Sequence, residues 1–142
     1  MSVGHMTRSE RDAFLADVHV GVLAIDEPGR GPLALPIWYR FVDGDVLINM
    51  EASSLKGRLL AAAGRATMTV QSEAPPYQYV SVEGPITIEP DDGEGLALAT
   101  RYLGPDFGKL YADANPPGAD SIVVRLRPDH WRTFDFNKVL GG

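Results

Sequence analysis

Two cations follow a pair of serines at a point where the sequence predicts the start of a helix. Ser53 and Ser54 come after a strand-like stretch, and Lys56 and Arg58 fall in the first turns of the helix. A helix N-terminus already carries about half a positive charge, so two cations there need compensation. A bound phosphate would provide it, because free backbone N–H groups, hydroxyls and cations together bind an anion. The alternative is a solvated helix with an ordinary serine N-cap.

A second candidate is the strand segment that contains Pro36, Ile37 and Trp38. Proline removes a donor from the strand ladder, so Pro36 indicates an edge or an opening in the sheet. Trp38 offers a flat aromatic surface, and unpaired backbone groups near Pro36 could hydrogen-bond the polar rim of a heterocycle. The alternative is that Pro36 marks a bulge and that Trp38 fills the core.

A third group is aromatic. Tyr77 and Tyr79 follow a Pro-Pro pair, and Trp131 and Phe134 lie in the last strand-like stretch. These side chains could form core, a subunit interface or the wall of a cofactor site, and packing is the simplest assignment.

Other catalytic signatures are missing. The chain has no cysteine, which excludes disulfides, thiolate metal sites and cysteine nucleophiles. His5, His19 and His130 have no second ligand at a metal-binding spacing, so we predict no metal site. No nucleophile elbow, Walker A loop, zinc-protease motif or dinucleotide-binding glycine motif is present, and no catalytic residue is assigned.

The composition fits one globular domain. The chain has 142 residues, of which 44% are hydrophobic and 23% charged. We expect a tail over residues 1–6 and one domain over 7–140. The net charge of −6 argues against nucleic-acid binding. No apolar stretch has the length of a membrane span or signal core, so we expect a cytoplasmic protein without a membrane partner.

Short strands joined by turns should position these residues. Thr7-x-x-Glu10 has the form of a capping box that opens a helix, and Asp43-Gly44 predicts a tight hairpin. Gly84-Pro85 indicates a bulge or an edge position. We expect a long loop over 104–120 that includes one helical turn. The predicted helices are 8–17, 53–63 and 91–103. The predicted strands are 18–25, 33–42, 45–50, 66–71, 77–89, 121–127 and 131–137, and the last two should pair as a hairpin.

The order of these parts resembles the pyridoxamine-phosphate-oxidase-like family of FMN-binding split barrels, and more narrowly the actinobacterial oxidoreductases that use the deazaflavin coenzyme F-420. The resemblance runs from about residue 7 to 140 and lies in the order and spacing of its motifs. The segments that carry it are Pro36-Ile37-Trp38-Tyr39, Asn49-Met50, Ser53-x-x-Lys56-x-Arg58-Leu59-Leu60, Ala66-Thr67-Met68-Thr69-Val70 and Tyr79-Val80-Ser81-Val82-Glu83-Gly84-Pro85.

This resemblance implies a mainly β (α+β) fold, a six-stranded antiparallel split β-barrel with flanking short helices. It also implies a homodimer with two cofactor sites at the interface. The residues that would hold the cofactor phosphate are Ser53, Ser54, Lys56 and Arg58. The ring would lie against Pro36, Ile37, Trp38, Asn49 and Met50, and the partner subunit would close the site, through Tyr77, Tyr79 or the C-terminal hairpin.

Two positions depart from the family pattern. Gly57 stands where many relatives have a larger residue, and Leu60 stands where an Asn is frequent. Glycine inside a helix should loosen it by about 1 kcal/mol relative to alanine.

The expected function is therefore an F-420-dependent oxidoreductase that transfers hydride to a small conjugated organic substrate. One alternative is an FMN-dependent enzyme of the same fold, because the two cofactors share a phosphate and a tricyclic ring. Another is a non-catalytic protein that binds a cofactor or haem.

Overall fold

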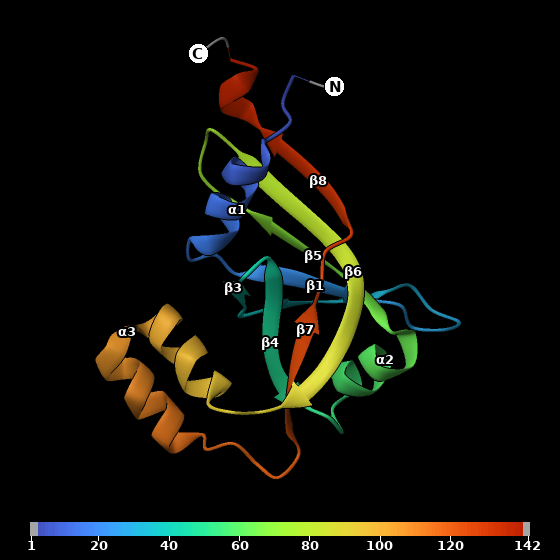
Figure 1. The fold of residues 1–142 in the computed structure, drawn as a ribbon, viewed down its shortest axis with the longest axis vertical. Coiled ribbons are helices and arrows are strands. Elements are labelled where there is room, and N and C mark those ends of the chain that lie inside the picture. The colour runs from blue at the N-terminus through green and yellow to red at the C-terminus, as the bar shows by residue number, and fades with distance from the viewer. Residues whose placement is uncertain (1–2, 141–142) are drawn as a thin grey trace.

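A computed structural model describes residues 3–140, which form eight strands and three α-helices (Figure 1). The helices are α1 (Arg8–Ala16), α2 (Leu55–Ala63) and α3 (Glu94–Ala114), followed near the C-terminus by a short 3-10 helix, η1 (Phe136–Lys138). The strands are β1 (Gly21–Ile25), β2 (Leu33–Ile37), β3 (Arg40–Val42), β4 (Asp45–Glu51), β5 (Arg65–Gln71), β6 (Gln78–Pro90), β7 (Ser121–Leu126) and β8 (His130–Asp135).

All strand pairs are antiparallel, and β6 joins the two halves of the sheet. The strand order is β2-β1-β5-β6-β7-β4-β3, with β8 also paired to β6. Strand β5 occupies one edge of β6. On the other edge β8 pairs with residues 78–83 and β7 pairs with residues 86–90. The sheet therefore curls into a half-barrel around a single core, a mainly β fold with helices at its margins (Figure 1).

The core consists of inward-facing residues from both halves of the curled sheet. Its fully buried members include Leu23 on β1, Ile48 on β4, Met68 on β5, Val82 on β6 and Leu126 on β7. Along β1 and β5 buried side chains alternate with more exposed ones, as in a sheet with one face on the core.

The local signals at turns and caps are confirmed. Thr7 and Glu10 form the capping box of α1. Ser54 caps α2, and Gly64 ends it with a φ of 72°. Asp43 and Gly44 both have positive φ, 51° and 85°, as a two-residue hairpin turn requires.

The strand predicted over 33–42 is interrupted at Trp38 and Tyr39, between β2 and β3. The backbone N–H of Tyr39 donates to the hydroxyl of Tyr102, at 3.1 Å. The Tyr102 hydroxyl also lies 3.1 Å from the Tyr39 carbonyl and 2.6 Å from that of His19. The Tyr102 side chain from α3 thus takes the place of a neighbouring strand as the hydrogen-bond partner of Tyr39, and the strand is interrupted there.

The long loop predicted over 104–120 is wrong for its first half, which is helical. Helix α3 bends at Gly104, where φ is 85° and ψ is 168°, and continues to Ala114. Pro105 follows the bend, where its missing N–H and fixed φ suit the first turn of a new helical segment. The predicted helix 91–103 therefore ends where the structure only changes the helix direction.

The predicted C-terminal hairpin is also wrong, because β7 and β8 pair with β6 and not with each other. They lie end to end along one edge of β6, so Gly84-Pro85 is not at a free edge. A Cβ atom on Gly84 would lie 1.9 Å from the carbonyl oxygen of Arg127. Glycine is needed there because the link between β7 and β8 passes directly against it.

The expected tail over residues 1–6 does not hold for its second half. Gly4 and Met6 are buried against β8. The Gly4 carbonyl accepts from Asp135 N–H at 2.8 Å, and Met6 N–H donates to the Thr133 hydroxyl at 2.9 Å. Residues 1 and 2 lie outside the described residues.

Candidate functional site

Two adjoining hollows form one groove between β4, the start of α2 and α3. Their volumes are about 460 Å³ and 250 Å³. They share four lining residues: Asn49, Lys56, Gly95 and Tyr111. We call the larger hollow the polar lobe and the smaller one the aromatic lobe. The groove connects two segments that we singled out separately in the sequence, the Trp38 strand end and the Lys56 helix start.

The aromatic lobe has Trp38 in its wall, together with Pro36 and Ile37. Trp38 stacks on Tyr102 with ring centroids 5.0 Å apart and planes 7° from parallel. The Tyr111 ring lies 5.6 Å from that of Trp38 and is tilted by 52°. Trp38 is therefore held by a partner of fixed orientation and remains half-buried at the groove, so it does not only fill the core.

Asn49 fixes the boundary between the two lobes. Its side-chain nitrogen lies 3.0 Å from the Ser121 hydroxyl, 3.0 Å from the Ile122 carbonyl and 3.3 Å from the Asp91 carboxylate. Asp91 also accepts from the Ser121 hydroxyl at 2.7 Å and from Glu94 N–H at 3.0 Å, at the start of α3. The Asp91 charge is thus hydrogen-bonded within the protein, and the network ties α3 to β4 and β7.

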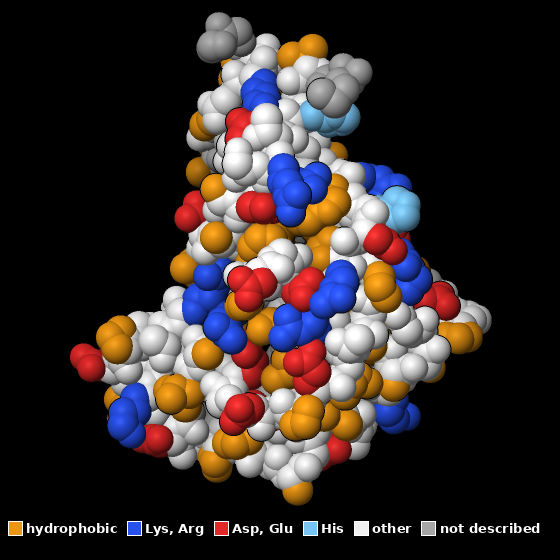
Figure 2. Space-filling view, in the orientation of Figure 1, with side chains coloured by type: hydrophobic (Ala, Val, Ile, Leu, Met, Phe, Trp, Pro, Cys, Tyr) orange, Lys and Arg blue, Asp and Glu red, His pale blue; other side chains and the backbone are white. Residues whose placement is uncertain are grey.

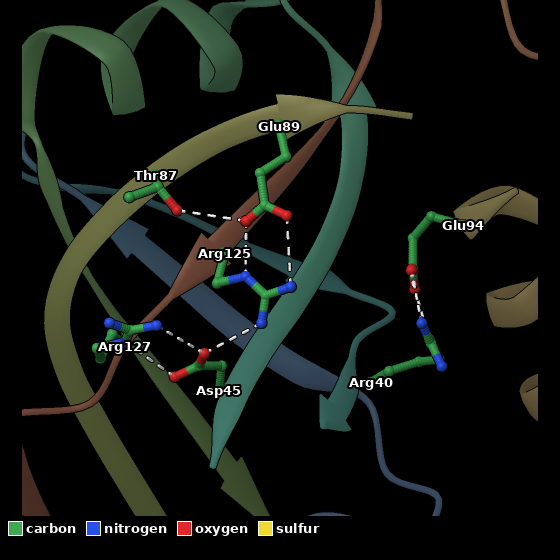
Figure 3. A network of polar contacts seen from close by, with 7 residues as sticks. All are labelled: Arg40, Asp45, Thr87, Glu89, Glu94, Arg125 and Arg127. Carbon is green, nitrogen blue, oxygen red and sulfur yellow. Dashed lines mark hydrogen bonds and ion pairs between the residues drawn. The ribbon is translucent and has the colours of Figure 1, made fainter. Parts of the chain in front are cut away.

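An ion pair with a buried carboxylate holds the same helix to β3. The Arg40 guanidinium donates to both carboxylate oxygens of Glu94, at 2.6 Å and 2.8 Å, and Glu94 is 6% exposed (Figure 3). The Glu94 hydrogen bonds raise the pKa of Arg40 above its ordinary value. A bidentate pair of this kind fixes the direction of the contact as well as its distance. The start of α3 is therefore held by two sets of contacts, the Arg40–Glu94 pair and the Asp91 network.

The start of α2 is a tightly packed turn. The Ser54 hydroxyl accepts from Gly57 N–H at 3.1 Å and donates to the Glu51 carbonyl at 2.6 Å. A Cβ atom on Gly57 would lie 2.5 Å from that carbonyl oxygen. Glycine is therefore the residue that lets this turn close, a contact that the expected loosening of the helix by Gly57 does not take into account.

Lys56 and Arg58 do not face the same space. Lys56 is half-buried and lines both lobes, and no residue from 3 to 140 forms an ion pair or hydrogen bond with its ammonium group. Arg58 is exposed and lines neither lobe. Ser53 is engaged elsewhere, since its hydroxyl and its N–H both contact the Asp120 carboxylate and lower the pKa of Asp120. Lys56 is thus the groove's available cation.

Solved structures resemble this fold over nearly its whole length. A conserved hypothetical protein of Mycobacterium tuberculosis has a TM-score of 0.82 and 23% identity, covering 100% of this chain and 92% of its own. An F420 reductase has a TM-score of 0.71 and 26% identity, covering 85% and 94%. A putative pyridoxamine 5'-phosphate oxidase of Listeria innocua has a TM-score of 0.68 and 12% identity, covering 88% and 95%.

The chain has the split-barrel fold of these structures. No protein-family model matches it, and no curated protein does. This fold agrees with the one that the resemblance implied, although the described residues form eight strands where six were expected.

Most of the predicted site residues meet in the groove of this split barrel. Those that line it are Pro36, Ile37, Trp38, Asn49, Met50, Ser54 and Lys56. Tyr77 and Tyr79 do not. They lie where β6 begins, beside the C-terminal aromatics, with Tyr77 6.4 Å from Phe136 and Tyr79 6.4 Å from Phe134.

The sequence did not single out two tyrosines that shape the split barrel's groove. Tyr102 supports Trp38 from within the predicted helix 91–103. Tyr111 lines both lobes but falls in the loop predicted over 104–120, within the single helical turn expected around 109–112. Recognition of a second helical segment after Pro105 would have placed Tyr111 on a helix packed against β4.

The outer face of the split barrel carries a second charge network, on β4, β6 and β7 (Figure 3). Arg125 donates to Glu89 at 2.6 Å and to Asp45 at 3.0 Å, and Arg127 approaches Asp45 at 3.4 Å. The hydrogen bond from Arg125 lowers the pKa of Glu89. Figure 2 shows acidic and basic side chains intermixed across this face. The charges compensate one another, so the face is not an open anion or cation site.

No helix among residues 3–140 is both long and apolar enough to cross a membrane, and the same residues contain no cluster of three potential metal ligands.

Proposed function

We propose that this split barrel is an oxidoreductase that binds coenzyme F-420 in the groove and reduces a small conjugated organic substrate. The observation that carries the proposal is the single groove in which an aromatic wall at Trp38 leads to an available cation at Lys56. The likeness to an F420 reductase, at 26% identity over 85% of the chain, supports a deazaflavin as the cofactor.

The groove residues suit the two ends of such a cofactor. Lys56 and the N-cap turn at Ser54 would hold the phosphate, because a cation and a helix start both favour an anion. Pro36, Ile37 and Trp38 would face the ring, with Asn49 and Met50 at the strand end beside it. Trp38 is held in place by Tyr102, so the wall is fixed before any ligand arrives.

When bound and reduced, a deazaflavin supplies a hydride. A conjugated C=C acceptor would take that hydride at one carbon and a proton at the other, giving CH–CH. The chain's own contribution is to orient the acceptor and to keep water from the ring. The proton would come from solvent or from a tyrosine.

We also propose that the protein works as a homodimer in which Tyr77 and Tyr79 of one subunit approach the groove of the other. Both are about half-exposed, at 50% and 39%, and lie outside their own groove.

Binding titrations of F-420 and FMN, side by side and followed by ring fluorescence, test this function. Lys56→Ala should weaken phosphate-bearing cofactors about tenfold or more, because a charged hydrogen bond of about 1.5–3 kcal/mol is lost. Arg58→Ala should have a smaller effect, since Arg58 is outside both lobes. The matched control is Lys109→Ala, an exposed lysine paired with Asp113 outside the groove. If neither cofactor binds the wild-type protein, the proposal is wrong, and tight binding of FMN alone would favour the FMN-dependent alternative.

A further inference from the structure

The polar lobe of the groove contains one cation and one carboxylate that have no partner within the described chain. Lys56 lines the lobe from the start of α2, and Glu51 lines it from the last position of β4. The Glu51 side chain is exposed, and its carboxylate forms no ion pair or hydrogen bond with any residue from 3 to 140. The two charges share a hollow of about 460 Å³ but do not pair with each other. An anionic ligand that reaches Lys56 therefore also meets the Glu51 carboxylate.

Strand register explains why Glu51 faces the lobe. Glu51 lies two residues after Asn49 on β4, so the two side chains share one face of the sheet. In the pairing of β4 with β7, Glu51 is opposite Ser121, which also lines the polar lobe. Both neighbours belong to the network that ties α3 to the sheet. The position of Glu51 is thus set by the same strands that form the groove.

The other charges around the lobe add to its negative side. Asp91 lines the lobe as well, although its carboxylate is hydrogen-bonded within the protein. Asp120 lies beside the start of α2, where the hydrogen bonds from Ser53 lower its pKa and keep it charged. Arg58 lines neither lobe. Lys56 is therefore a single cation in surroundings that are otherwise acidic.

In such a lobe the number of negative charges on a phosphate should decide how well it binds. A phosphodiester, the form in F-420, carries one charge, which one lysine can match. A phosphomonoester, the form in FMN, carries about 1.5–2 negative charges near pH 7. The second charge would have no cation to meet and would be repelled by Glu51, and a partly enclosed groove screens that repulsion less than open water does.

From these observations we propose that Glu51 is a specificity residue, which makes the groove select a singly charged phosphodiester over a doubly charged phosphomonoester. This inference rests on the proposed function for the position of the phosphate, and it deepens it by naming the class of phosphate. Specificity then comes from repulsion of the wrong ligand as well as from attraction of the right one.

Riboflavin and FMN test the role of Glu51, because they share one ring and differ only in the phosphate. Their dissociation constants are measured by flavin fluorescence at about pH 8 and low ionic strength. The wild-type protein should bind FMN at most about threefold more tightly than riboflavin, because attraction to Lys56 and repulsion from Glu51 oppose each other. Glu51→Gln should bind FMN about fivefold more tightly than the wild type does, with riboflavin unchanged.

Two further variants separate the local charge from other effects. Glu51→Asp keeps the carboxylate and should bind FMN as the wild type does. Asp26→Asn is the matched control, because it removes one exposed carboxylate and changes the net charge equally, but lines neither lobe. It should leave the affinities for both flavins unchanged. Since the Glu51 and Asp26 side chains are exposed, the unfolding midpoints of all three variants should match that of the wild type.

A pair of probes without a ring makes the test independent of the cofactor. Methyl phosphate and dimethyl phosphate differ by one charge, and their binding is followed by the backbone amide NMR signals of Lys56 and Gly57. In Glu51→Gln the affinity for methyl phosphate should rise about fivefold and that for dimethyl phosphate only about twofold.

The inference is overturned if Glu51→Gln strengthens riboflavin as much as FMN, if Asp26→Asn has the same effect as Glu51→Gln, or if the two methyl phosphates gain equally. Failure of F-420 and both flavins to bind, with the phosphate result as expected, would overturn the proposed function and not the role of Glu51. Absence of any signal change at Lys56 and Gly57 with either phosphate would overturn both.

Discussion

Tyr102 is the residue on which the shape of the aromatic lobe depends most. Its hydroxyl contacts the carbonyls of His19 and Tyr39 and accepts from the Tyr39 N–H, while its ring supports Trp38. One side chain therefore satisfies the backbone at the break between β2 and β3 and also orients the aromatic wall.

Tyr102→Phe should lower the free energy of unfolding by about 1–3 kcal/mol, because it leaves buried backbone groups without a partner. Urea unfolding followed by circular dichroism measures the change. Tyr111→Phe is the control, since its hydroxyl has no hydrogen-bond partner among residues 3–140, and its loss should be smaller than about 0.5 kcal/mol. Equal losses for the two variants would contradict the role given to the Tyr102 hydroxyl.

Glu10 should make the stability depend on pH in acid. Its carboxylate accepts from Lys138 at 2.6 Å and from Thr7 N–H at 2.7 Å, and these bonds lower its pKa from 4.5 to about 2. A carboxyl whose pKa is lower in the folded state stabilises the fold above pH 4.5 and loses that contribution as pH falls to about 2. The unfolding midpoint of Glu10→Gln should therefore vary less than that of the wild type over this range. Carbon-detected NMR titration checks the pKa directly, and Lys138→Ala should raise it.

Single residues show where sequence reasoning works and where it stops. Ser54 could be predicted as an N-cap because its partner, Gly57 N–H, lies three residues away. The residue types of Trp38 and Lys56 marked them as candidate site residues. The groove that both of them line, however, exists only because α3 packs beside them. The role of Gly57 could not be predicted, because it depends on how closely the preceding turn of the chain packs against this residue.

At the scale of elements, α2 depends on a close approach that helix propensity does not describe. The chain turns back from the end of β4 so tightly that the carbonyls of Glu51 and Ala52 face the Gly57 Cα, with a Cβ position only 2.5 Å and 2.8 Å from their oxygens.

Gly57→Ala should therefore destabilise the protein by about 1–3 kcal/mol, as an overpacked substitution does. Helix propensity alone would predict that Gly57→Ala raises the free energy of unfolding by about 1 kcal/mol. The two expectations have opposite sign, so thermal or urea unfolding decides between them. Ala61→Gly, at an exposed position of the same helix, is the comparison and should lose about 1 kcal/mol by propensity. A more stable Gly57→Ala variant would refute the close-approach explanation.

The errors in the predicted elements have one physical origin. The Asp43-Gly44 turn and the helix caps depend on neighbours in sequence, and those predictions were correct. The pairing of β7 with β6, the break at Tyr39 and the second segment of α3 depend on partners distant in the chain. Gly104-Pro105 illustrates the limit, since the same two residues can end a helix or redirect it, and the local sequence does not select between the two outcomes.

At the scale of the molecule, β6 belongs to both halves of the curled sheet. Its first half is enclosed by β5 and β8 and its second half is paired with β7, so neither half of the barrel can lose its structure without exposing part of the same strand. We expect the protein to unfold as one cooperative unit.

The two tryptophans can test this cooperativity, because they report from different parts of the sheet. Trp38 lies between β2 and β3, and Trp131 lies on β8, where Arg11 stacks over its ring at 3.9 Å. In Trp131→Phe only Trp38 emits, and in Trp38→Phe only Trp131 does. In each variant the fluorescence midpoint in urea should coincide with the midpoint from circular dichroism. Separate midpoints within one variant would show that the halves unfold independently.

The bonds that join residues 4–6 to β8 place a constraint on folding during synthesis. A ribosome makes Gly4 and Met6 early and Thr133 and Asp135 more than 120 residues later, yet each early residue has its hydrogen-bond partner in the late strand. Until β8 emerges, the first half of β6 also has one unpaired edge. The nascent chain must therefore wait, partly open, for its last strand, and a chaperone that covers an exposed strand edge would be most useful to it during that interval.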